Sequence, residues 1–224
     1  MRILNGPFTI AVVVYNPSQK VIENANNIFA SVRKTLGESN VQCIVVDNSP
    51  QPNDVLKEQF KSYPLIDVYH WNQGYNIYWA GGINKAVQLS TGEVFIHFLP
   101  TRGIERNPDW VKKLIAPLVD EKVGMSGPVR SCYYDRVTGD LTGLETNPAK
   151  QYHVQQAVFA ARTHVLKDIS WGPNHPHAYS DVEHSINLIR AGYQLVNVPE
   201  VSSTAANHAS NPNSMFECGQ HIKE

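Results

Sequence analysis

The chain has 224 residues, and its composition of 42% hydrophobic and 17% charged residues is typical of a globular protein rather than a disordered one. Its 19 Lys and Arg residues nearly balance 20 Asp and Glu residues, for a formal net charge of −1. This balance creates no broad positive field, so nucleic acid is not an expected partner.

The first apolar run, residues 8–15, is too short to span a membrane. Cys43, Cys132 and Cys218 have no metal-ligand spacing, and their odd count argues against a disulfide framework. We therefore expect a protein of the reducing cytoplasm without a membrane span, with Cys43 as a buried apolar residue.

The first half of the sequence alternates apolar strands with amphipathic helices. Residues 8–14 (FTIAVVV) and 41–46 (VQCIVV) are continuous apolar runs, typical of parallel strands covered on both faces. Between them lies a helical pattern, with Ser18 as its expected N-cap and Gly37 after its last turn. A helix over about 54–62 and a strand at 66–69 complete a doubly wound βαβ order.

The second half continues this order with shorter elements. The predicted strands are 93–99, 123–129, 154–161 and 193–198, and the predicted helices begin near 80, 110, 165 and 182. Residues 131–153 have no clear period and are predicted to form a hairpin or loop excursion. The fold class is thus α/β: a single domain over residues 1–208, with a doubly wound, mostly parallel central sheet flanked by helices. The polar tail 209–224 is expected to be loosely ordered.

Polar clusters follow four of the predicted strands. They are Tyr15-Asn16, Asp47-Asn48-Ser49, Asn72-Gln73-Gly74 and Pro100-Thr101-Arg102. Ligands of open α/β sheets bind beyond the carboxyl ends of the strands, so these clusters should converge on one edge. Each cluster alone is equally typical of a turn, but the four together favour a shared binding site.

Some of these residues have a specific chemistry. Asp47 could accept the imide N–H of a uracil or thymine ring, on which Tyr15 could stack; the alternatives are an Asx turn and ordinary packing. Gly81-Gly82 at a helix start would expose backbone N–H groups to a phosphate or sugar. The sequence there matches neither GxGxxG nor GxxxxGK[ST], so dinucleotide and P-loop sites lack their motifs.

The succession AVVVYNPS, IVVDNS, NQGYNIYWAGGINKA, TGEVFIHFLP and PDW resembles the family-two glycosyltransferases, and most of all their rhamnosyltransferase-like branch. QQAVFAARTHVL, YSDVEHSINLIRAGY and the run to Asn207-His208 continue the resemblance, which spans about residues 8–208. It implies a GT-A-type domain that moves a sugar from a nucleoside-diphosphate sugar, of UDP or dTDP type, to a glycan, a glycoconjugate or another hydroxyl acceptor. Polysaccharide biosynthesis is the implied setting.

The resemblance also implies roles for individual residues. The nucleotide base and ribose pocket would be lined by Tyr15, Asn16, Asp47 and Asn48, and the ribose and diphosphate would lie near Asn72, Gly74, Gly82 and Asn84. Asp181 matches the general base of inverting members, which takes the proton of the acceptor hydroxyl as its oxygen attacks the anomeric carbon. The alternative is structural, because Ser180-Asp181-Val182-Glu183 also fits a capping box.

The sequence departs from the family where a metal-binding Asp-x-Asp element is expected. After Leu99 it has Pro-Thr-Arg-Gly, with no acidic residue before Glu105. Arg102 could hold phosphate oxygens in place of Mg²⁺ or Mn²⁺, with Lys85 and His208 as further donor-binding groups. We therefore predict that no metal cofactor is required. The alternatives are a site that uses Mg²⁺ or Mn²⁺ after all, and a degenerate site in which Arg102 faces solvent.

Trp171, His177 and Glu183 are predicted to border the acceptor pocket near Asp181, because amphipathic side chains suit a sugar with an apolar face and a polar rim. Simple loop packing is the alternative.

The leading function is an inverting glycosyltransferase; its rival is a catalytically inactive nucleotide-sugar- or glycan-binding module on the same fold. A nucleotidyltransferase is disfavoured, since no Gly-rich loop with Arg or Lys follows the first strand.

Overall fold

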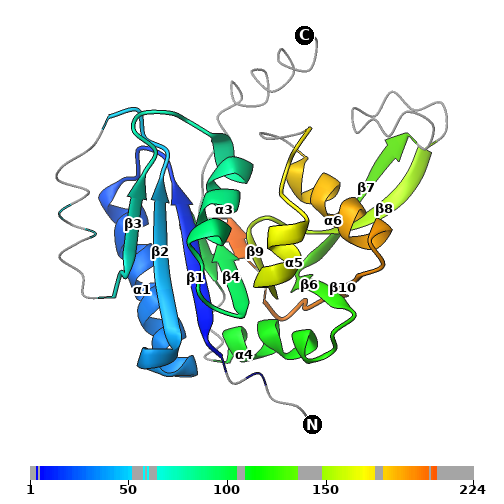
Figure 1. Ribbon diagram of the computed structural model, residues 1–224, viewed down its shortest axis with the longest axis horizontal. Helices are drawn as coiled ribbons and strands as arrows, with labels where there is room; N and C mark the ends of the chain where they lie inside the picture. The colour runs from blue at the N-terminus through cyan, green and yellow to red at the C-terminus, as the bar shows by residue number, and fades with distance from the viewer. Residues whose placement is uncertain are drawn as a thin grey trace.

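A computed structural model describes residues 4, 6–51, 58, 60, 65–104, 109–135, 148–174, 179–201 and 203–205 (Figure 1). The main sheet has seven strands in the order β10-β6-β9-β4-β1-β2-β3. Its strands are β1 (Phe8–Val14), β2 (Val41–Asp47), β3 (Val68–Trp71), β4 (Val94–Phe98), β6 (Val123–Gly127), β9 (Val158–Arg162) and β10 (Gln194–Asn197). Two small sheets pair β5 (Arg102–Ile104) with β11 (Ser203–Ala205), and β7 (Val129–Asp135) with β8 (Pro148–Val154).

The helices cover both faces of the main sheet. They are α1 (Gln19–Leu36), η1 (Glu38–Asn40), α3 (Tyr78–Leu89), α4 (Trp110–Ile115), η2 (Ala116–Val119), α5 (Thr163–Asp168) and α6 (Ser180–Arg190). Every residue of β1 is buried. Because successive strand residues point to opposite faces, Ile10 and Val12 join one core cluster with α1 and α4, whereas Ala11 and Val13 join a second cluster with α3 and α5.

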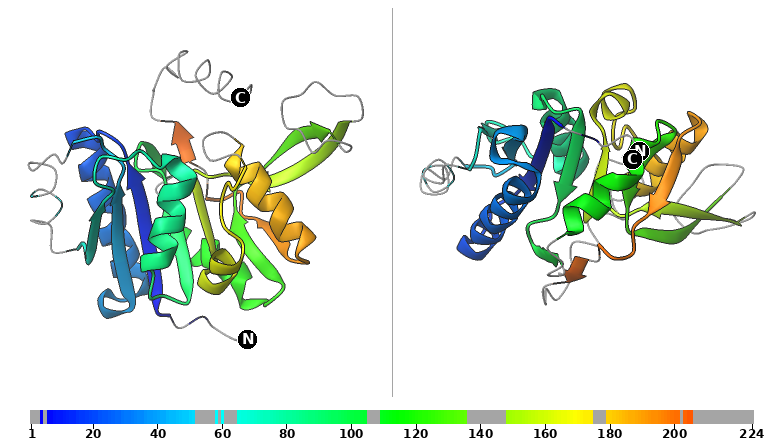
Figure 2. Two further views of the ribbon diagram at one scale, coloured as in Figure 1. Left: turned by 45° about the horizontal axis from the view of Figure 1, so that its top comes forward. Right: turned by 90° about the horizontal axis from the view of Figure 1, so that it is seen from below.

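The sheet is mostly parallel, as the sequence predicts. β1 runs parallel to β2 and β4, β2 to β3, and β10 to β6; only β9 runs antiparallel to its neighbours β4 and β6. The predicted α/β class with a doubly wound central sheet is therefore confirmed. The paired strands β7 and β8 extend away from this sheet (Figures 1 and 2), as expected of an excursion.

Several predicted boundaries are wrong for local reasons. The strand expected at 154–161 is the end of β8, a turn and then β9. Pro128 separates β6 from β7, since proline has no N–H to give to a strand ladder. The helix expected to run from 110 to 118 tightens into a 3₁₀ turn at Ala116, with Pro117 next to it. Ser18 takes the N-cap position of α1 but makes no side-chain capping bond.

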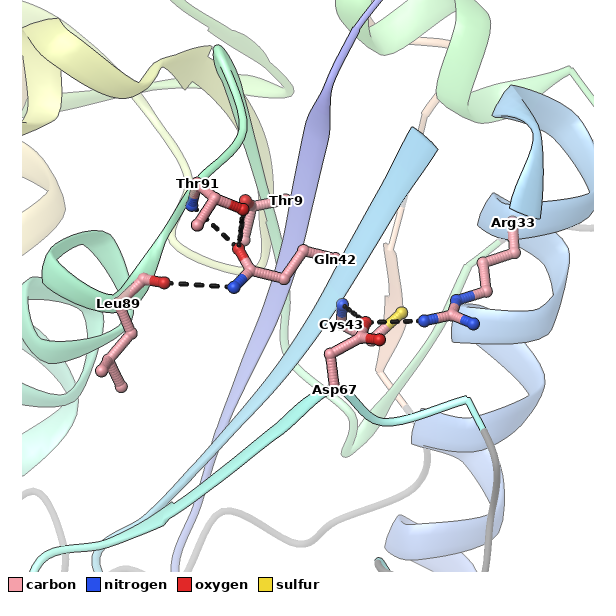
Figure 3. A network of polar contacts seen from close by, with 7 residues as sticks. All are labelled: Thr9, Arg33, Gln42, Cys43, Asp67, Leu89 and Thr91. Carbon is pink, nitrogen blue, oxygen red and sulfur yellow. Dashed lines mark hydrogen bonds and ion pairs between the residues drawn. The ribbon is translucent and has the colours of Figure 1, made fainter. Parts of the chain in front are cut away.

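The amino ends of the central strands are joined by side-chain hydrogen bonds (Figure 3). The Gln42 side-chain oxygen, Oε1, accepts hydrogen bonds from Thr9 Oγ1 at 2.9 Å and from Thr91 N at 2.9 Å. The Gln42 side-chain nitrogen, Nε2, donates to Leu89 O at 3.2 Å. Nearby, Asp67 Oδ2 accepts from Arg33 at 2.6 Å and from Cys43 N at 2.7 Å. These contacts fix the strand ends opposite the candidate site.

Cys43 is a free, buried cysteine, as predicted. Burial raises the pKa of its thiol to about 11, so the thiol is protonated at neutral pH and behaves as a small apolar side chain. Within the described residues, no helix has both the length and the apolar character needed to cross a membrane. The predicted helix at 54–62 lies largely outside the described residues, and the tail 209–224 lies wholly outside them.

Candidate active site

The carboxyl ends of β1, β2 and β3 are held together by backbone and side-chain hydrogen bonds. Asn16 N donates to Ser49 Oγ at 2.8 Å, and Asn48 N donates to Val14 O at 2.9 Å. Asn72 N donates to Asp47 O at 3.0 Å. Three of the four polar clusters singled out in the sequence thus lie side by side at one edge of the sheet.

Asp47 is fully buried at this edge. Its Oδ1 accepts from Ser49 N at 2.9 Å and from Ser49 Oγ at 2.5 Å, and its Oδ2 accepts from Tyr69 Oη at 2.6 Å. This is the turn geometry weighed above as the alternative to base recognition. An ionised carboxylate accepts about four hydrogen bonds, so a nucleotide base would have to use the remaining position. Base recognition by Asp47 stays a prediction.

Asn48 connects the β2 end to two other segments. Its Nδ2 donates to Tyr78 O at 2.8 Å, at the start of α3, and its Oδ1 accepts from Asn72 Nδ2. Gly82 lies against the same group: a Cβ there would stand 2.5 Å from Val13 Cγ1 and 3.3 Å from Asn48 Nδ2. Only glycine lets α3 approach β1 this closely, so Gly82 has a packing role whether or not a donor binds.

Gly74 lies in the β3–α3 loop with φ +87°, a left-handed conformation that glycine adopts without strain. A Cβ there would stand 2.9 Å from Pro50 O. Tyr15, directly after β1, is 54% exposed. Lys85, on α3, is partly buried.

Among the described residues, four residues other than glycine have positive φ: Asn16 (φ 43°), Gln73 (φ 54°), Tyr78 (φ 58°) and Tyr179 (φ 61°). Asn16 follows β1 and Gln73 lies between β3 and α3. Tyr78 is the first residue of α3, and Tyr179 is the N-cap of α6. Residues other than glycine in this strained, left-handed conformation are concentrated at functional sites, and no local sequence pattern predicts them.

Asp181 stands one residue into α6, with 17% of its side chain exposed. Its Oδ1 accepts from Val182 N at 3.0 Å and its Oδ2 from Gln156 N at 3.4 Å. His153 Nε2 lies 3.7 Å from the same Oδ2. The carboxylate is therefore oriented by a group of its own helix and by a group of the segment between β8 and β9, and 17% of the side chain is exposed.

The capping-box interpretation of this segment is wrong. The N-cap of α6 is Tyr179, and Ser180 is its first helical residue, with an Oγ that has no hydrogen-bond partner. Glu183 instead accepts from Asn174, at 3.2 Å from N and 2.6 Å from Nδ2. Because the helix begins one residue earlier than the motif requires, Ser180 and Glu183 do not cap each other. Glu183 is 7% exposed and accepts from the preceding loop, so its predicted place at the acceptor pocket stays a prediction.

Packing engages two residues that the sequence assigns to ligands, and both assignments stay predictions. Trp171 is 1% exposed and stacks on His184, with ring centroids 4.1 Å apart and planes 13° apart. Asn84 uses both side-chain polar atoms on the Trp171 backbone: Nδ2 donates to the carbonyl and Oδ1 accepts from the N–H, each at 2.9 Å. In this arrangement the Asn84 amide is not directed at a donor.

Trp171 belongs to a cluster of packed aromatic rings that includes Trp79 and His97 of β4. The sequence analysis did not predict this cluster. Trp79 packs edge-on against Trp171 and His97, and its Nε1 donates to His97 Nε2 at 3.2 Å. His97 Nδ1 must then carry the proton, which it donates to Ala11 O at 3.0 Å. Burial lowers the pKa of both His97 and His184 to about 3, so both rings are neutral at physiological pH.

The segment that follows β4, where the family resemblance places a metal-binding Asp pair, has no carboxylate in residues 99–104. Arg102 begins β5, where its backbone pairs with Ala205 of β11; its side chain, like His177 and His208, lies outside the described residues. Residues 99–104 read LPTRGI, and such a set does not fit a divalent cation, which takes carboxylate oxygens. Among the described residues, no group of three His, Cys, Asp or Glu side chains could hold a metal ion.

Residues 9–178, more than half of the chain, match the family described as glycosyl transferase family 2. The chain therefore belongs to this family, and its sheet order and helix layers are those of GT-A glycosyltransferases. No curated protein matches the sequence.

Solved structures share the fold at low sequence identity. The mannosyltransferase PcManGT from Pyrobaculum calidifontis, in complex with GDP-Man and Mn²⁺, superposes with a TM-score of 0.70 at 13% identity, covering 98% of this chain and 65% of that chain. Glucosyl-3-phosphoglycerate synthase from Mycobacterium tuberculosis, with Mn²⁺, UDP and phosphoglyceric acid, gives 0.62 at 13% identity over 96% and 75%. GalNAc-T7, with UDP, GalNAc and Mn²⁺, gives 0.66 at 15% identity over 88% and 43%. The chain thus spans less than two thirds of PcManGT and of GalNAc-T7.

Proposed function

We propose that the protein is an inverting glycosyltransferase that moves a hexosyl or deoxyhexosyl group from a UDP- or dTDP-sugar to a hydroxyl acceptor on a glycan or glycoconjugate. The observation that carries this proposal is the position of Asp181. A partly exposed carboxylate, oriented by two backbone N–H groups, stands in the first turn of α6.

In the proposed reaction Asp181 takes the proton of the acceptor hydroxyl as that oxygen bonds to the anomeric carbon. The bond from the anomeric carbon to the diphosphate oxygen breaks, and the nucleoside diphosphate leaves with the electron pair. Attack from the face opposite the leaving group inverts the configuration. The protein must therefore hold the donor diphosphate and the acceptor on opposite sides of the sugar.

The donor is proposed to lie over the ends of β1, β2 and β3. Tyr15 would stack on the base, Asp47 and Asn48 would line the base and ribose pocket with Asn16, and Asn72, Gly74 and Gly82 would lie along the ribose and diphosphate. Support comes from the strained, exposed backbone at Asn16 and Tyr78 and from the exposed ring of Tyr15. The fold neighbours bound to GDP-Man or UDP add to it.

Charge neutralisation without a required metal is part of the proposal. Arg102, Lys85 and His208 would share the diphosphate charge with backbone N–H groups at the start of α3. The motivation is the sequence LPTRGI after β4, which has no carboxylate for a cation. The Mn²⁺ in the complexes of the fold neighbours favours the opposite outcome, so metal dependence needs its own measurement.

A second candidate is a binding module on the same fold that has lost catalysis. The absence of carboxylates in residues 99–104 favours the binding module as well, because a donor site that no longer supports catalysis would lose its metal-binding carboxylates first. We favour the enzyme, since Asp181 retains an oriented and reachable carboxylate. Within the enzyme proposal we place the protein in the rhamnosyltransferase-like branch, in cytoplasmic polysaccharide biosynthesis.

Ligand-induced thermal shift tests the proposed donor class. UDP, dTDP, GDP and their common sugar conjugates are each added at 1 mM, and the unfolding midpoint is recorded with and without Mn²⁺. A ligand at 100 times its Kd stabilises the native state by about 2.7 kcal/mol, which raises the midpoint by several degrees. We expect a rise with a UDP or dTDP compound. If none of these nucleotides moves the midpoint, the proposed donor class is wrong.

A further inference from the structure

Asn174 joins the segment before α6 to the first turn of that helix. Its side-chain Nδ2 donates to Glu183 Oε1 at 2.6 Å, and its backbone N donates to the same oxygen at 3.2 Å. Glu183 is 7% exposed, whereas Asn174 lies at the surface. A carboxyl group that is shielded from water needs its hydrogen bonds met within the protein, so this contact, the Asn174–Glu183 clamp, fixes the loop at a specific place.

The clamp is made at the start of α6, where the backbone is strained. Tyr179, the N-cap, has φ 61°, and its carbonyl accepts from Glu183 N at 2.9 Å. Glu183 thus bonds the N-cap through its backbone and Asn174 through its side chain. Asp181 lies two residues before Glu183, in the same turn. A tyrosine in the left-handed conformation persists only where surrounding contacts hold it, so the clamp supports the turn that carries Asp181.

We propose that Asn174 and Glu183 are positioning residues: they hold the first turn of α6 so that the Asp181 carboxylate keeps its place. This inference rests on the proposed function, and it is an alternative to the acceptor contact that the sequence predicts for Glu183. The Asp181 carboxylate is bonded to Val182 N at 3.0 Å and to Gln156 N, between β8 and β9, at 3.4 Å. A shifted helix start would break the bond to Gln156, because its two ends lie on different segments. A displacement of about 1 Å can cost a general base about 100-fold in rate.

The loop that carries Asn174 is also fastened to α3. Three residues before Asn174, the backbone N and O of Trp171 are bonded to the Asn84 side chain, each at 2.9 Å. Residues 171–174 are therefore bonded to α3 at one end and to α6 at the other. This matters for the clamp, because a bond to an unattached loop would not hold the start of a helix in place.

Amide hydrogen exchange tests the clamp without any ligand. Exchange is followed residue by residue by NMR in the wild type, in Asn174→Ala and in Asn27→Ala, where Asn27 is an exposed asparagine of α1. In Asn174→Ala the N–H groups of Gln156 and Val182, both bonded to Asp181, should exchange at least about tenfold faster. Amides of β1, and all amides of Asn27→Ala, should exchange as in the wild type. Unchanged exchange at Gln156 and Val182, or an equal rise in β1 that reports a loss of global stability, would overturn the inference.

Turnover separates positioning from direct chemistry by Glu183. It is measured as nucleoside diphosphate released from the donor that thermal shift identifies, with water as the acceptor. Because Asn174 N and Nδ2 both donate to Oε1, Glu183→Gln can keep the clamp with its amide oxygen, whereas Glu183→Ala cannot. We expect Glu183→Ala and Asn174→Ala each to lower kcat at least about tenfold with donor affinity within about twofold. The double variant should lose no more than either single variant, since both remove one interaction, and Glu183→Gln should keep most of the rate.

The outcomes for the clamp and for the proposed function can be told apart. A Glu183→Gln variant as slow as Glu183→Ala, or wild-type kcat in Asn174→Ala, would contradict the positioning role. Asp181→Asn is the reference: if it turns over like the wild type, the proposed base is wrong. If the wild type releases no nucleoside diphosphate, the proposed function fails, and the exchange measurement still decides whether the clamp holds the Asp181 carboxylate.

Discussion

Asn84 on α3 holds the backbone of Trp171 with both polar atoms of its side chain, through two hydrogen bonds of 2.9 Å. The two residues are 87 positions apart in the chain. This bond pair joins α3 to the segment between α5 and α6. Both polar atoms of the Asn84 side chain are thus engaged within the protein, and contact between Asn84 and a donor stays a prediction.

Asn84→Ala should lower the free energy of unfolding by about 1–3 kcal/mol, because the Trp171 N–H and C=O lose their partners. Urea unfolding measures the change, and Gln88→Ala, at an exposed position of the same helix, is the matched control. Equal stability of Asn84→Ala and wild type, combined with weaker nucleotide binding, would restore the donor-binding role that the sequence predicts for Asn84.

Both carboxylate oxygens of Asp47 are bonded within the protein, Oδ2 to Tyr69 and Oδ1 to Ser49, and the proposed binding of a base by Asp47 can be tested separately from the Tyr69 bond. Tyr69→Phe removes one of these bonds and leaves the carboxylate in place. We expect Tyr69→Phe to lower stability by about 1 kcal/mol with little effect on nucleotide affinity, and Asp47→Ala to weaken UDP or dTDP binding by about 1–3 kcal/mol as well. Calorimetry on the two folded variants decides this; unchanged affinity in Asp47→Ala would remove Asp47 from the base pocket.

The buried histidines make stability depend on pH in a defined direction. Burial lowers the pKa of His97 to about 3, below the value of about 6.5 for an unfolded chain. The stability contributed by the neutral ring is therefore complete above pH 6.5 and is lost as the pH falls towards 3, because the unfolded state binds the extra proton.

Each such histidine should cost about 2 kcal/mol of stability between pH 7 and pH 5. His97→Gln cannot bind this proton, so its unfolding free energy should fall less over that range than that of the wild type. Denaturant unfolding at the two pH values, with exposed His164→Gln as control, measures the difference. Parallel pH dependences in His97→Gln and wild type would contradict a buried neutral His97.

The sequence predicts well those parts of the fold that depend on local residue patterns. The apolar runs at 8–14 and 41–46 indicate buried parallel strands, and the polar residues that follow them meet at one edge because parallel strands end together. Trp171 could not be placed in this way. Its burial depends on contacts with His184 and with Asn84, the latter 87 positions away in the chain. An aromatic residue in a polar loop is equally compatible with an exposed sugar platform.

The start of α6 shows a second limit. Ser180 and Glu183 have the spacing of a capping box, but Tyr179 adopts a left-handed conformation and moves the helix start by one residue. A positive φ at tyrosine has no local sequence signal, since tyrosine has no intrinsic preference for it. The surrounding structure imposes this geometry, and the candidate base Asp181 lies two residues further on.

Metal dependence is tested by initial rates with the correct donor over a range of EDTA concentrations. We expect little loss of rate in EDTA, because β4 ends at Phe98 and the following residues, LPTRGI, offer a cation no carboxylate. Arg102→Ala should reduce turnover far more than Lys85→Ala, and Mn²⁺ should rescue neither variant. Complete loss of activity in EDTA that Mn²⁺ restores would show that other carboxylates hold a metal.

The central claim, sugar transfer with Asp181 as the base, is tested most directly by the turnover of Asp181→Asn. This variant keeps the size and hydrogen-bonding capacity of the side chain but removes its basicity. With a donor identified by thermal shift, the initial rate of transfer is compared in wild type, Asp181→Asn and Asp168→Asn, the last at an exposed carboxylate of α5. The account predicts a loss on the order of 100-fold or more in Asp181→Asn, with donor affinity nearly unchanged, and wild-type turnover in Asp168→Asn. Near-wild-type turnover in Asp181→Asn would contradict it.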